Sequence, residues 1–380
     1  MLAFLLLATV QATDTDIVVT GTRLDDAYTQ CVARRCSPLR DAQVSIAWAE
    51  RAFRKGSYMA AKRGLAAAVA RNRSVAAAAP RPVAALYEAY GTVALQEGDL
   101  DIYRDAVGAQ VRTLRDNLPA SDPAVSDADL ALGDMWMKAG DTGNAKAAYE
   151  RAQETATIHG HDVTALSAGL RLVTLANERG HRAEASRLLE AIARSRSGQK
   201  PGMEAIIPAF RLRLAASRAD EAEVDRQIAA MARSSSDVRP ILISSPPFEE
   251  VAATAAEDHA VKFGDINRFA TRSMEIKGLD WADVGFWIRP DGRTAEISVL
   301  RSGGGGSWTR LAAKQISARR YATVAGDRSG AGVYRIERYT LRGSGYRVPV
   351  GSHVRRRAGP MRLEVLDITS LPDTPSKPSS

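Results

Sequence analysis

Apolar residues near the C-terminus recur at every second position. Residues 284–288 and residues 295–299 each show this alternation, and a Pro-Asp-Gly turn signal at residues 290–292 lies between them. Alternation of this kind predicts half-buried β-strands, and the glycine of the turn can take a positive φ. From Leu311 to Tyr321 the spacing of apolar residues becomes helical. The stretch therefore predicts strand, turn, strand and helix.

Two further apolar runs follow this helix. Residues 333–342 alternate again, and residues 361–369 contain a shorter apolar strand. Together these elements predict a small α+β domain with an antiparallel sheet at residues 281–369. Prolines near the start of residues 238–280 stop helices, so this region is expected to be a linker followed by further helices. The Pro/Ser-rich residues 370–380 are expected to be a disordered tail.

The middle of the chain, residues 41–237, is helical and repetitive. Tight turns recur there at intervals of 42, 42, 40 and 39 residues, at Gly56, Gly98, Gly140, Gly180 and residues 218–220. A fixed period in this range is the signature of a solenoid built from helix pairs. The sequence therefore predicts a mainly α protein whose helical hairpins stack on one another, followed by the small α+β domain.

The third hairpin carries the clearest repeat pattern. Leu132 and Gly133 precede its turn, and Ala145, Tyr149 and Ala152 follow it. Small residues let two helices approach closely, and the large residue fills the gap to the next pair. The corresponding residues of the other hairpins are Ala61, Leu65 and Ala68 in the first, and Ala185 and Leu189 in the fourth. The second and fifth hairpins depart from the pattern, since Tyr103 and Val224 stand where alanine is expected. In this pattern the repeats resemble the tetratricopeptide family, which implies a scaffold for protein partners.

Residues 281–321 resemble a second family. Their order is strand, Pro-Asp-Gly turn, strand, small-residue loop, and a helix that ends at Arg320 and Tyr321. This order is similar to that of the C-terminal domain of TonB-type energy transducers. The resemblance implies a domain that binds an envelope protein through the edge of its sheet. No Q-P-x-Y-P motif precedes the first strand, so we expect binding rather than energy coupling.

The N-terminus contains a candidate export signal. Residues 1–12 form an apolar run that ends in small residues, which predicts a secretory signal and a periplasmic protein, with outer-membrane association as an option. A buried N-terminal helix is the alternative, and no permanent membrane span is expected elsewhere. Residues 13–40 are expected to be a tail in which Cys31 and Cys36 form a disulfide, as suits an oxidising compartment.

A possible strand-forming segment follows the export signal. Residues 16–23 read D-I-V-V-T-G-T-R and resemble the N-terminal box of TonB-dependent outer-membrane receptors. In those receptors this segment is extended and adds a strand to the transducer's sheet. Ile17, Val18 and Val19 have high β propensity, so they are candidate partner-binding residues. This hypothesis allows self-association, and a flexible terminus without a binding role is the alternative.

Basic residues gather in the C-terminal domain. The chain has a formal net charge of +8, and residues 281–360 hold 15 Lys and Arg against 5 Asp and Glu. Since an exported chain does not meet nucleic acid, we expect an acidic protein or anionic envelope material as the partner, unless these arginines only solvate the surface. The candidate basic rim consists of Arg319, Arg320, Arg355, Arg356 and Arg357.

Aromatic residues are also concentrated in this domain. They are Trp281, Trp287, Trp308, Tyr321, Tyr334 and Tyr339. Such residues form either an exposed interaction face or the core of a small sheet. We assign Trp308 and Tyr321 to the core and keep Trp287 as a candidate partner-binding residue.

Motifs for catalysis are weak in this chain. His159, His161 and Asp162 are of metal-binding type, but a loop between repeats explains them better because no further ligand lies near them in sequence. The glycine run at residues 303–306 lacks the phosphate-loop pattern and indicates a strand-to-helix connection. The chain contains no H-E-x-x-H, G-x-S-x-G or G-x-G-x-x-G motif. We therefore expect no enzyme activity, no cofactor and no metal.

These observations predict an exported periplasmic protein that binds other proteins through a helical-repeat scaffold and a TonB-like domain. One alternative is an accessory or transducer-like component of TonB-dependent transport, with TonB-system components as partners. The other is an envelope enzyme, or the regulator of one, that acts on peptidoglycan.

Overall fold

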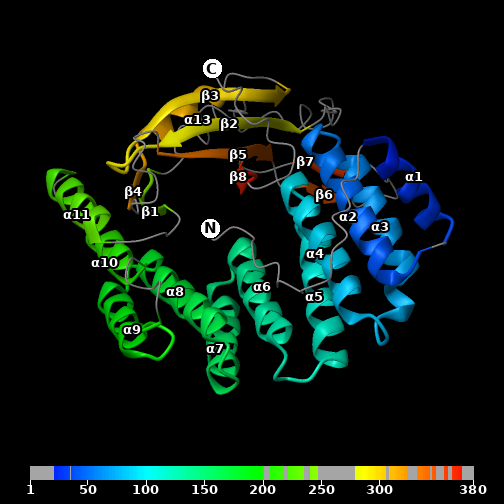
Figure 1. The fold of residues 1–380 in the computed structure, drawn as a ribbon, viewed down its shortest axis with the longest axis horizontal. Coiled ribbons are helices and arrows are strands. Elements are labelled where there is room, and N and C mark those ends of the chain that lie inside the picture. Colours follow the sequence, from blue (N-terminus) through cyan, green and yellow to red (C-terminus); the bar gives the residue numbers. More distant parts are fainter. Residues whose placement is uncertain are drawn as a thin grey trace, which may run out of the picture. The chain divides into compact units, whose positions relative to one another are not determined.

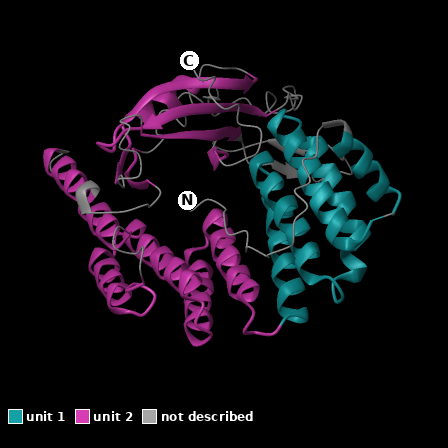
Figure 2. Cartoon of the chain, in the orientation of Figure 1, with its two compact units in different colours: residues 1–118 teal, residues 119–380 magenta. Residues whose placement is uncertain are grey.

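The computed structural model covers the 380-residue chain, and it describes most of the residues. The described residues are 21–34, 36–200, 206–216, 221–234, 240–246, 279–304, 308–322, 332–342, 345–347, 355–357 and 362–369. The expected export signal, the candidate strand at residues 17–19, the fifth turn, the helices expected after residue 247 and the C-terminal tail lie outside these ranges. The chain divides into two compact units, residues 1–118 and residues 119–380 (Figure 2).

The first unit is helical throughout its described part. Helix α1 (Gly21–Val32) comes first, and a short 3-10 helix, η1 (Arg73–Val75), separates two helical hairpins. The hairpins are α2 (Pro38–Arg54) with α3 (Tyr58–Asn72), and α4 (Pro80–Glu97) with α5 (Leu100–Asn117).

Helix α1 corrects one expectation, because residues 13–40 were expected to be a tail. Leu24 and Cys31 of α1 are buried in one cluster with Val44 of α2, and the ring of Tyr28 stacks on Trp48 at 4.5 Å. These residues lie on one face of a helix, so burial on α2 explains why the segment is helical. The expected disulfide between Cys31 and Cys36 is formed, with a Cα–Cα distance of 4.9 Å, and it ties the end of α1 to the start of α2.

A buried carboxylate joins α2 to α3. Asp41 accepts hydrogen bonds from Arg71 at 2.7 and 3.0 Å, from Asn72 at 2.7 Å and from Ser45 at 2.9 Å. Burial alone would raise the pKa of Asp41, but these hydrogen bonds and the positive charge of Arg71 outweigh it and lower the pKa. The network holds the ends of the first hairpin together.

This network predicts a pH-dependent stability. The folded pKa of Asp41 lies below the unfolded value of about 3.9, so the carboxylate contributes stability above that pH, and the contribution is lost as the pH falls through the folded pKa. Asp41→Asn should cost about 1.5–3 kcal/mol at pH 7, the range for hydrogen bonds to charged groups. The free energies of unfolding of wild type and variant, measured by urea denaturation from pH 7 to pH 3, should differ less and less below about pH 4. A constant difference, or an equal loss in the exposed control Asp105→Asn, would contradict the assignment.

The second unit continues the hairpins. They are α6 (Pro123–Ala139) with α7 (Thr142–Ile158), α8 (Asp162–Glu178) with α9 (Arg182–Arg194), and α10 (Ile206–Ala216) with α11 (Glu221–Ser234). Within this unit, α6, α8 and α10 follow one another in one layer, and α7 and α9 lie beside them in a second layer (Figure 1). The predicted succession of helix pairs is therefore confirmed.

Four of the predicted turns contain a glycine with left-handed backbone. The φ angles are 78° at Gly56, 86° at Gly98, 81° at Gly140 and 79° at Gly180. Glycine takes this conformation without the steric cost of a Cβ, so it ends the first helix of each hairpin and lets the chain reverse. Glycine therefore recurs in the sequence because the turn of each of these hairpins requires a residue with a positive φ.

The small-on-large packing predicted for the third hairpin is also present. Ala145 and Ala152 of α7 are fully buried, and Tyr149 between them is 3% exposed. A Cβ on Gly133 of α6 would overlap the ring of Tyr149. The absence of a side chain at Gly133 therefore sets how closely α6 and α7 approach.

The C-terminal part of the second unit is a small αβ domain. Its four strands pair antiparallel in the order β3-β2-β5-β8, and α13 (Thr309–Ser317) packs on one face. Two short strand pairs accompany this sheet, β1 with β4 and β6 with β7. The strands are β1 (Ile241–Ser244), β2 (Asp280–Ile288), β3 (Thr294–Gly303), β4 (Arg320–Ala322), β5 (Val333–Arg342), β6 (Gly345–Arg347), β7 (Arg355–Arg357) and β8 (Arg362–Asp367).

The face of the sheet beneath α13 forms the core of this domain. Phe286 of β2 and Ile316 of α13 are fully buried there. Trp308 and Tyr321 belong to the same core, with 7% and 0% of their surface exposed, so their assignment to the core is confirmed. The predicted strands and helix thus assemble around one apolar face.

Two expectations for this region are wrong in detail. The helix was expected to continue to Arg320 and Tyr321, but α13 ends at Ser317, and these two residues belong to β4. Strand β4 pairs with β1, which lies in the region expected to be a linker, and Tyr321 also donates its backbone N–H to the carbonyl of Gly292 at 2.8 Å. Pairing and burial therefore override the helical spacing of the sequence.

Within the residues described, no helix is long and apolar enough to cross a membrane.

Candidate functional site

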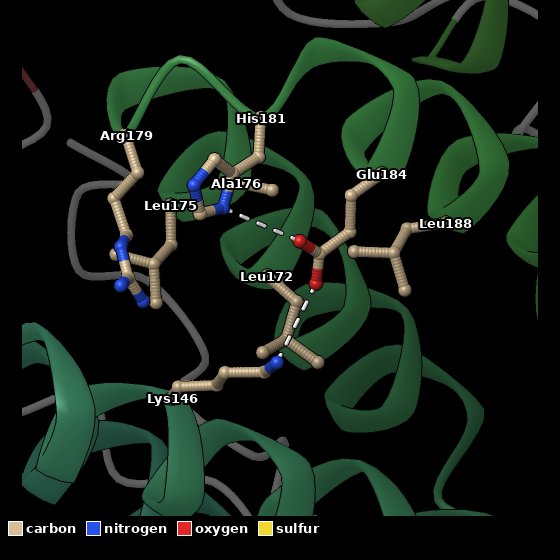
Figure 3. A pocket seen from close by; sticks show the side chains of 8 residues that line it. All are labelled: Lys146, Leu172, Leu175, Ala176, Arg179, His181, Glu184 and Leu188. Atoms are coloured by element: carbon tan, nitrogen blue, oxygen red, sulfur yellow. Dashed lines mark hydrogen bonds and ion pairs between the residues drawn. The ribbon is translucent and has the colours of Figure 1, made fainter.

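A pocket opens in the fourth repeat, where α8 and α9 meet α7 (Figure 3). Its cavity volume is about 220 Å³. Four apolar side chains form the floor, and four polar or charged side chains form the rim. The floor consists of Leu172, Leu175, Ala176 and Leu188, and the rim consists of Lys146, Arg179, His181 and Glu184.

The floor lies at the seam between two packed clusters. Leu172 and Leu175 are buried against the third hairpin, and Ala176 is buried against α9. Leu188 is half-buried and touches both clusters. The pocket is therefore a gap left by the stacking of the repeats, with aliphatic carbon beneath it.

The rim is charged, and one of its charges is neutralised. Glu184 lies 3.4 Å from Lys146 and 3.5 Å from Nδ1 of His181, and Figure 3 shows the two reaching its carboxylate from different sides. Arg179 is exposed beside Leu175, and its guanidinium has no hydrogen bond or ion pair with any other residue that the structure describes. The rim therefore carries a surplus positive charge at Arg179.

The second candidate surface is the edge of the sheet. Among the described strands, β3 pairs with β2 alone, so its other edge is unpaired there. Residues 298–302 of β3 are exposed, and Val299 and Leu300 each expose 44% of their surface. Glu296 lies where the pairing of β3 with β2 is irregular, and its φ is 51°. Its carboxylate accepts a hydrogen bond from Arg289 at 2.6 Å. An exposed edge strand with apolar side chains is a template for pairing with another chain.

Arg319 was expected on a basic rim, and this expectation is wrong. The residue is 5% exposed, and its guanidinium donates to Glu337 at 2.8 Å and to the hydroxyls of Tyr321 at 3.1 Å and Tyr339 at 2.8 Å. Burial alone would lower the pKa of Arg319, but the charge of Glu337 and the two tyrosines outweigh it and raise the pKa. Arg319 therefore holds the core together and is not available to a partner.

The other predicted site residues differ in their positions. Arg320 is half-buried, and its Nε lies 3.5 Å from Asp225 of α11. Trp287 is half-buried, and its ring centroid lies 5.1 Å from that of Tyr334. The residues whose side chains lie outside the described part are Ile17, Val18, Val19, Arg355, Arg356 and Arg357, although the last three form β7.

The other face of the sheet contains an ion pair that the sequence analysis missed. Asp283 of β2 and Arg338 of β5 are both fully buried and hydrogen-bonded to each other. The Arg338 guanidinium also lies 4.0 Å from the ring centroid of Trp281, and Arg301 pairs with Oδ2 of Asp283 at 2.7 Å, an oxygen that also accepts a hydrogen bond from Arg338. The buried carboxylate of Asp283 is therefore shared by two guanidinium groups, one buried and one half exposed to solvent.

The candidate metal residues remain in a loop between repeats. The ring centroids of His159 and His161 are 5.9 Å apart, and Asp162 is paired with Lys200 at 2.5 Å. Hydrogen bonding to Lys200 and its charge outweigh burial and lower the pKa of Asp162. Among the described residues, no group of three or more His, Cys, Asp or Glu is placed to hold a metal ion.

Comparison with known proteins gives matches only among solved structures. No family model and no curated protein matches this chain. A kinesin light chain-like protein of Podosopora anserina with nearly identical TPR-like repeats is 16% identical, with a TM-score of 0.41 over 51% of this chain and 93% of that one. BtubC (BKLC) from P. vanneervenii is 16% identical, with a TM-score of 0.45 over 60% and 96%. The apo form of RapI is 7% identical, with a TM-score of 0.44 over 62% and 81%.

The chain itself is mainly α-helical, with helix pairs in a tetratricopeptide-like arrangement and a small antiparallel sheet near the C-terminus. This description rests on the turn glycines, the succession of hairpins and the small-on-large packing of this chain.

Proposed function

We propose that this protein is an exported scaffold that binds polypeptide partners, through its repeats and through the edge of β3 that faces away from β2. Among the described strands, the edge of β3 that faces away from β2 has no partner, and this edge, with Val299 and Leu300 exposed, is the observation that carries the proposal. A partner strand that pairs with this edge gains main-chain hydrogen bonds, and alternate side chains on it give specificity. The helical repeats add an extended second surface, as stacked helix pairs do in solenoid proteins.

The cell envelope is the proposed location. The disulfide between Cys31 and Cys36 supports an oxidising compartment such as the periplasm. The apolar residues 1–12 support export through a signal sequence.

The proposed partners are envelope proteins. The order of β2, the turn at residues 290–292, β3 and α13 supports a likeness to the TonB C-terminal domain. A role in TonB-dependent transport is the second candidate, and the receptor-like residues 16–23 favour it. In that case TonB-system receptors or transducers are the partners.

Blocking the β3 edge should test the proposal. In the variant Val299→Lys/Leu300→Lys, two lysines replace the exposed apolar residues, and lysine on an edge strand opposes pairing. We expect crosslinked envelope partners to fall about tenfold or more in this variant, which corresponds to about 1.4 kcal/mol of binding free energy. The measurement is quantitative mass spectrometry after crosslinking in periplasm and membranes.

Val333→Lys is the control, because Val333 is 40% exposed on the inner strand β5 and undergoes the same valine-to-lysine change as Val299. Equal capture by wild type, control and edge variant would remove strand addition from the proposal. Loss of TonB-system proteins in particular would support the transport role, and loss of other envelope proteins would support the scaffold without it.

A further inference from the structure

We infer that the pocket of the fourth repeat binds an acidic peptide segment of a partner, with one aliphatic side chain on the pocket floor and a neighbouring side-chain carboxylate on Arg179. This inference rests on the proposed function as a polypeptide-binding scaffold. It concerns α7, α8 and α9, and it shares no residue with the edge of β3.

The floor of the pocket favours an aliphatic side chain. Leu172, Leu175, Ala176 and Leu188 present carbon to a cavity of about 220 Å³. At about 30 Å³ for each water, several waters would fill this space over a surface that offers them few hydrogen bonds. Displacing poorly held water with an apolar group gains affinity. A leucine-like side chain of a partner therefore suits the floor.

The rim selects the charge of the partner. Lys146 and His181 lie against Glu184, so the carboxylate of Glu184 is already matched. The guanidinium of Arg179 has no such match among the described residues and is exposed at the opening. An acidic group of the partner would form a charge-assisted hydrogen bond there, and a basic group would be repelled. The pocket thus combines an apolar floor with the exposed guanidinium of Arg179 at its rim.

Neighbouring features explain why the ligand is a peptide segment. The cavity of about 220 Å³ is of a size for one side chain, and it is lined by residues of α7, α8, α9 and the exposed turn between α8 and α9. Solenoid repeats bind along extended surfaces in this manner. A single side chain in the pocket then fixes the register of the partner.

Selection from a random peptide library displayed on phage tests the inference with the full-length protein. We expect the enriched peptides to share an aliphatic residue next to Asp or Glu. Synthetic peptides of that sequence should lose about fivefold or more in affinity when the acid is changed to its amide or the aliphatic residue to serine. The measurement is fluorescence anisotropy of the labelled peptide at low salt.

The variant Arg179→Glu should lower the affinity of the same peptide by about fivefold or more. Its matched control is Arg187→Glu, which makes the same change of charge at an exposed residue of α9 that does not line the pocket. Enriched peptides without an acidic residue, no enrichment, or an equal loss in both variants would overturn the inference. If it fails while the β3 edge variant still loses its partners, the proposed function stands without this site.

Discussion

Replacing Asp283 by leucine is expected to destabilise the C-terminal αβ domain by about 3–5 kcal/mol, because it removes the carboxylate that pairs with a buried guanidinium. Asp283 and Arg338 are both fully buried, and Arg338 also packs on the ring of Trp281. In the variant, the guanidinium of Arg338 stays buried without the carboxylate of Asp283, and burial keeps water from solvating that positive charge. Equilibrium unfolding in urea, followed by tryptophan fluorescence, measures the loss.

Two further variants separate the buried pair from general disruption. Arg301→Met removes the outer partner of Asp283, whose side chain is 50% exposed, so its cost should stay below about 1 kcal/mol. The double variant Asp283→Leu/Arg338→Met removes both buried charges and should recover most of the stability, since apolar replacement of a buried pair is often neutral or favourable. If the free energy of unfolding of the single variant Asp283→Leu lies within about 1 kcal/mol of the wild-type value, the assigned role of Asp283 is wrong.

The alternation of apolar residues predicted β2, β3 and β5, because the burial of one face of a strand leaves an alternating pattern in that strand's own residues. It did not predict that charged residues on both faces of β5 are buried. Glu337 lies under α13 with Arg319, and Arg338 lies on the opposite face with Asp283. Each charge is matched by a residue at a distant position, and a sequence pattern does not contain the register that brings them together.

The same reason explains the wrong assignment of Arg319. Adjacent arginines at residues 319 and 320 indicate a solvated surface when only their charge is considered. The sequence contains Glu337, but only the strand pairing places it within hydrogen-bond distance of Arg319. Strand β1 was missed for a related reason, since it has four residues beside prolines and is defined by pairing with β4 far along the chain.

The repeats were more predictable than the pocket. The turn glycines are required by the backbone, so they recur visibly in the sequence at Gly56, Gly98, Gly140 and Gly180. The pocket residues come from three helices, and each of them alone is compatible with an ordinary polar or apolar helix face. Only the packing of α7 and α9 on α8 brings Lys146 to Glu184 and leaves Arg179 without an ion pair among the described residues.

Substitution of a glycine in the third hairpin tests how strictly that stacking is set. Gly133→Ala should destabilise the second unit by about 1–3 kcal/mol, because its new Cβ overlaps the ring of Tyr149. Tyr149 cannot turn away freely, since it is 3% exposed and its hydroxyl donates to Asp134 at 2.7 Å. Alanine improves helix propensity by up to about 1 kcal/mol, so the net loss reports the clash.

Gly143→Ala on the same hairpin is the matched control for this prediction. Gly143 is exposed in α7, and a Cβ there would meet only ordinary contact with Asp141 at 3.6 Å. This variant should therefore be neutral or gain up to about 1 kcal/mol. The two glycines undergo the same substitution, so urea denaturation should move their unfolding midpoints in opposite directions. If Gly133→Ala is also neutral or stabilising, the close approach of α6 and α7 does not depend on Gly133, and small-on-large packing does not explain the spacing of this repeat.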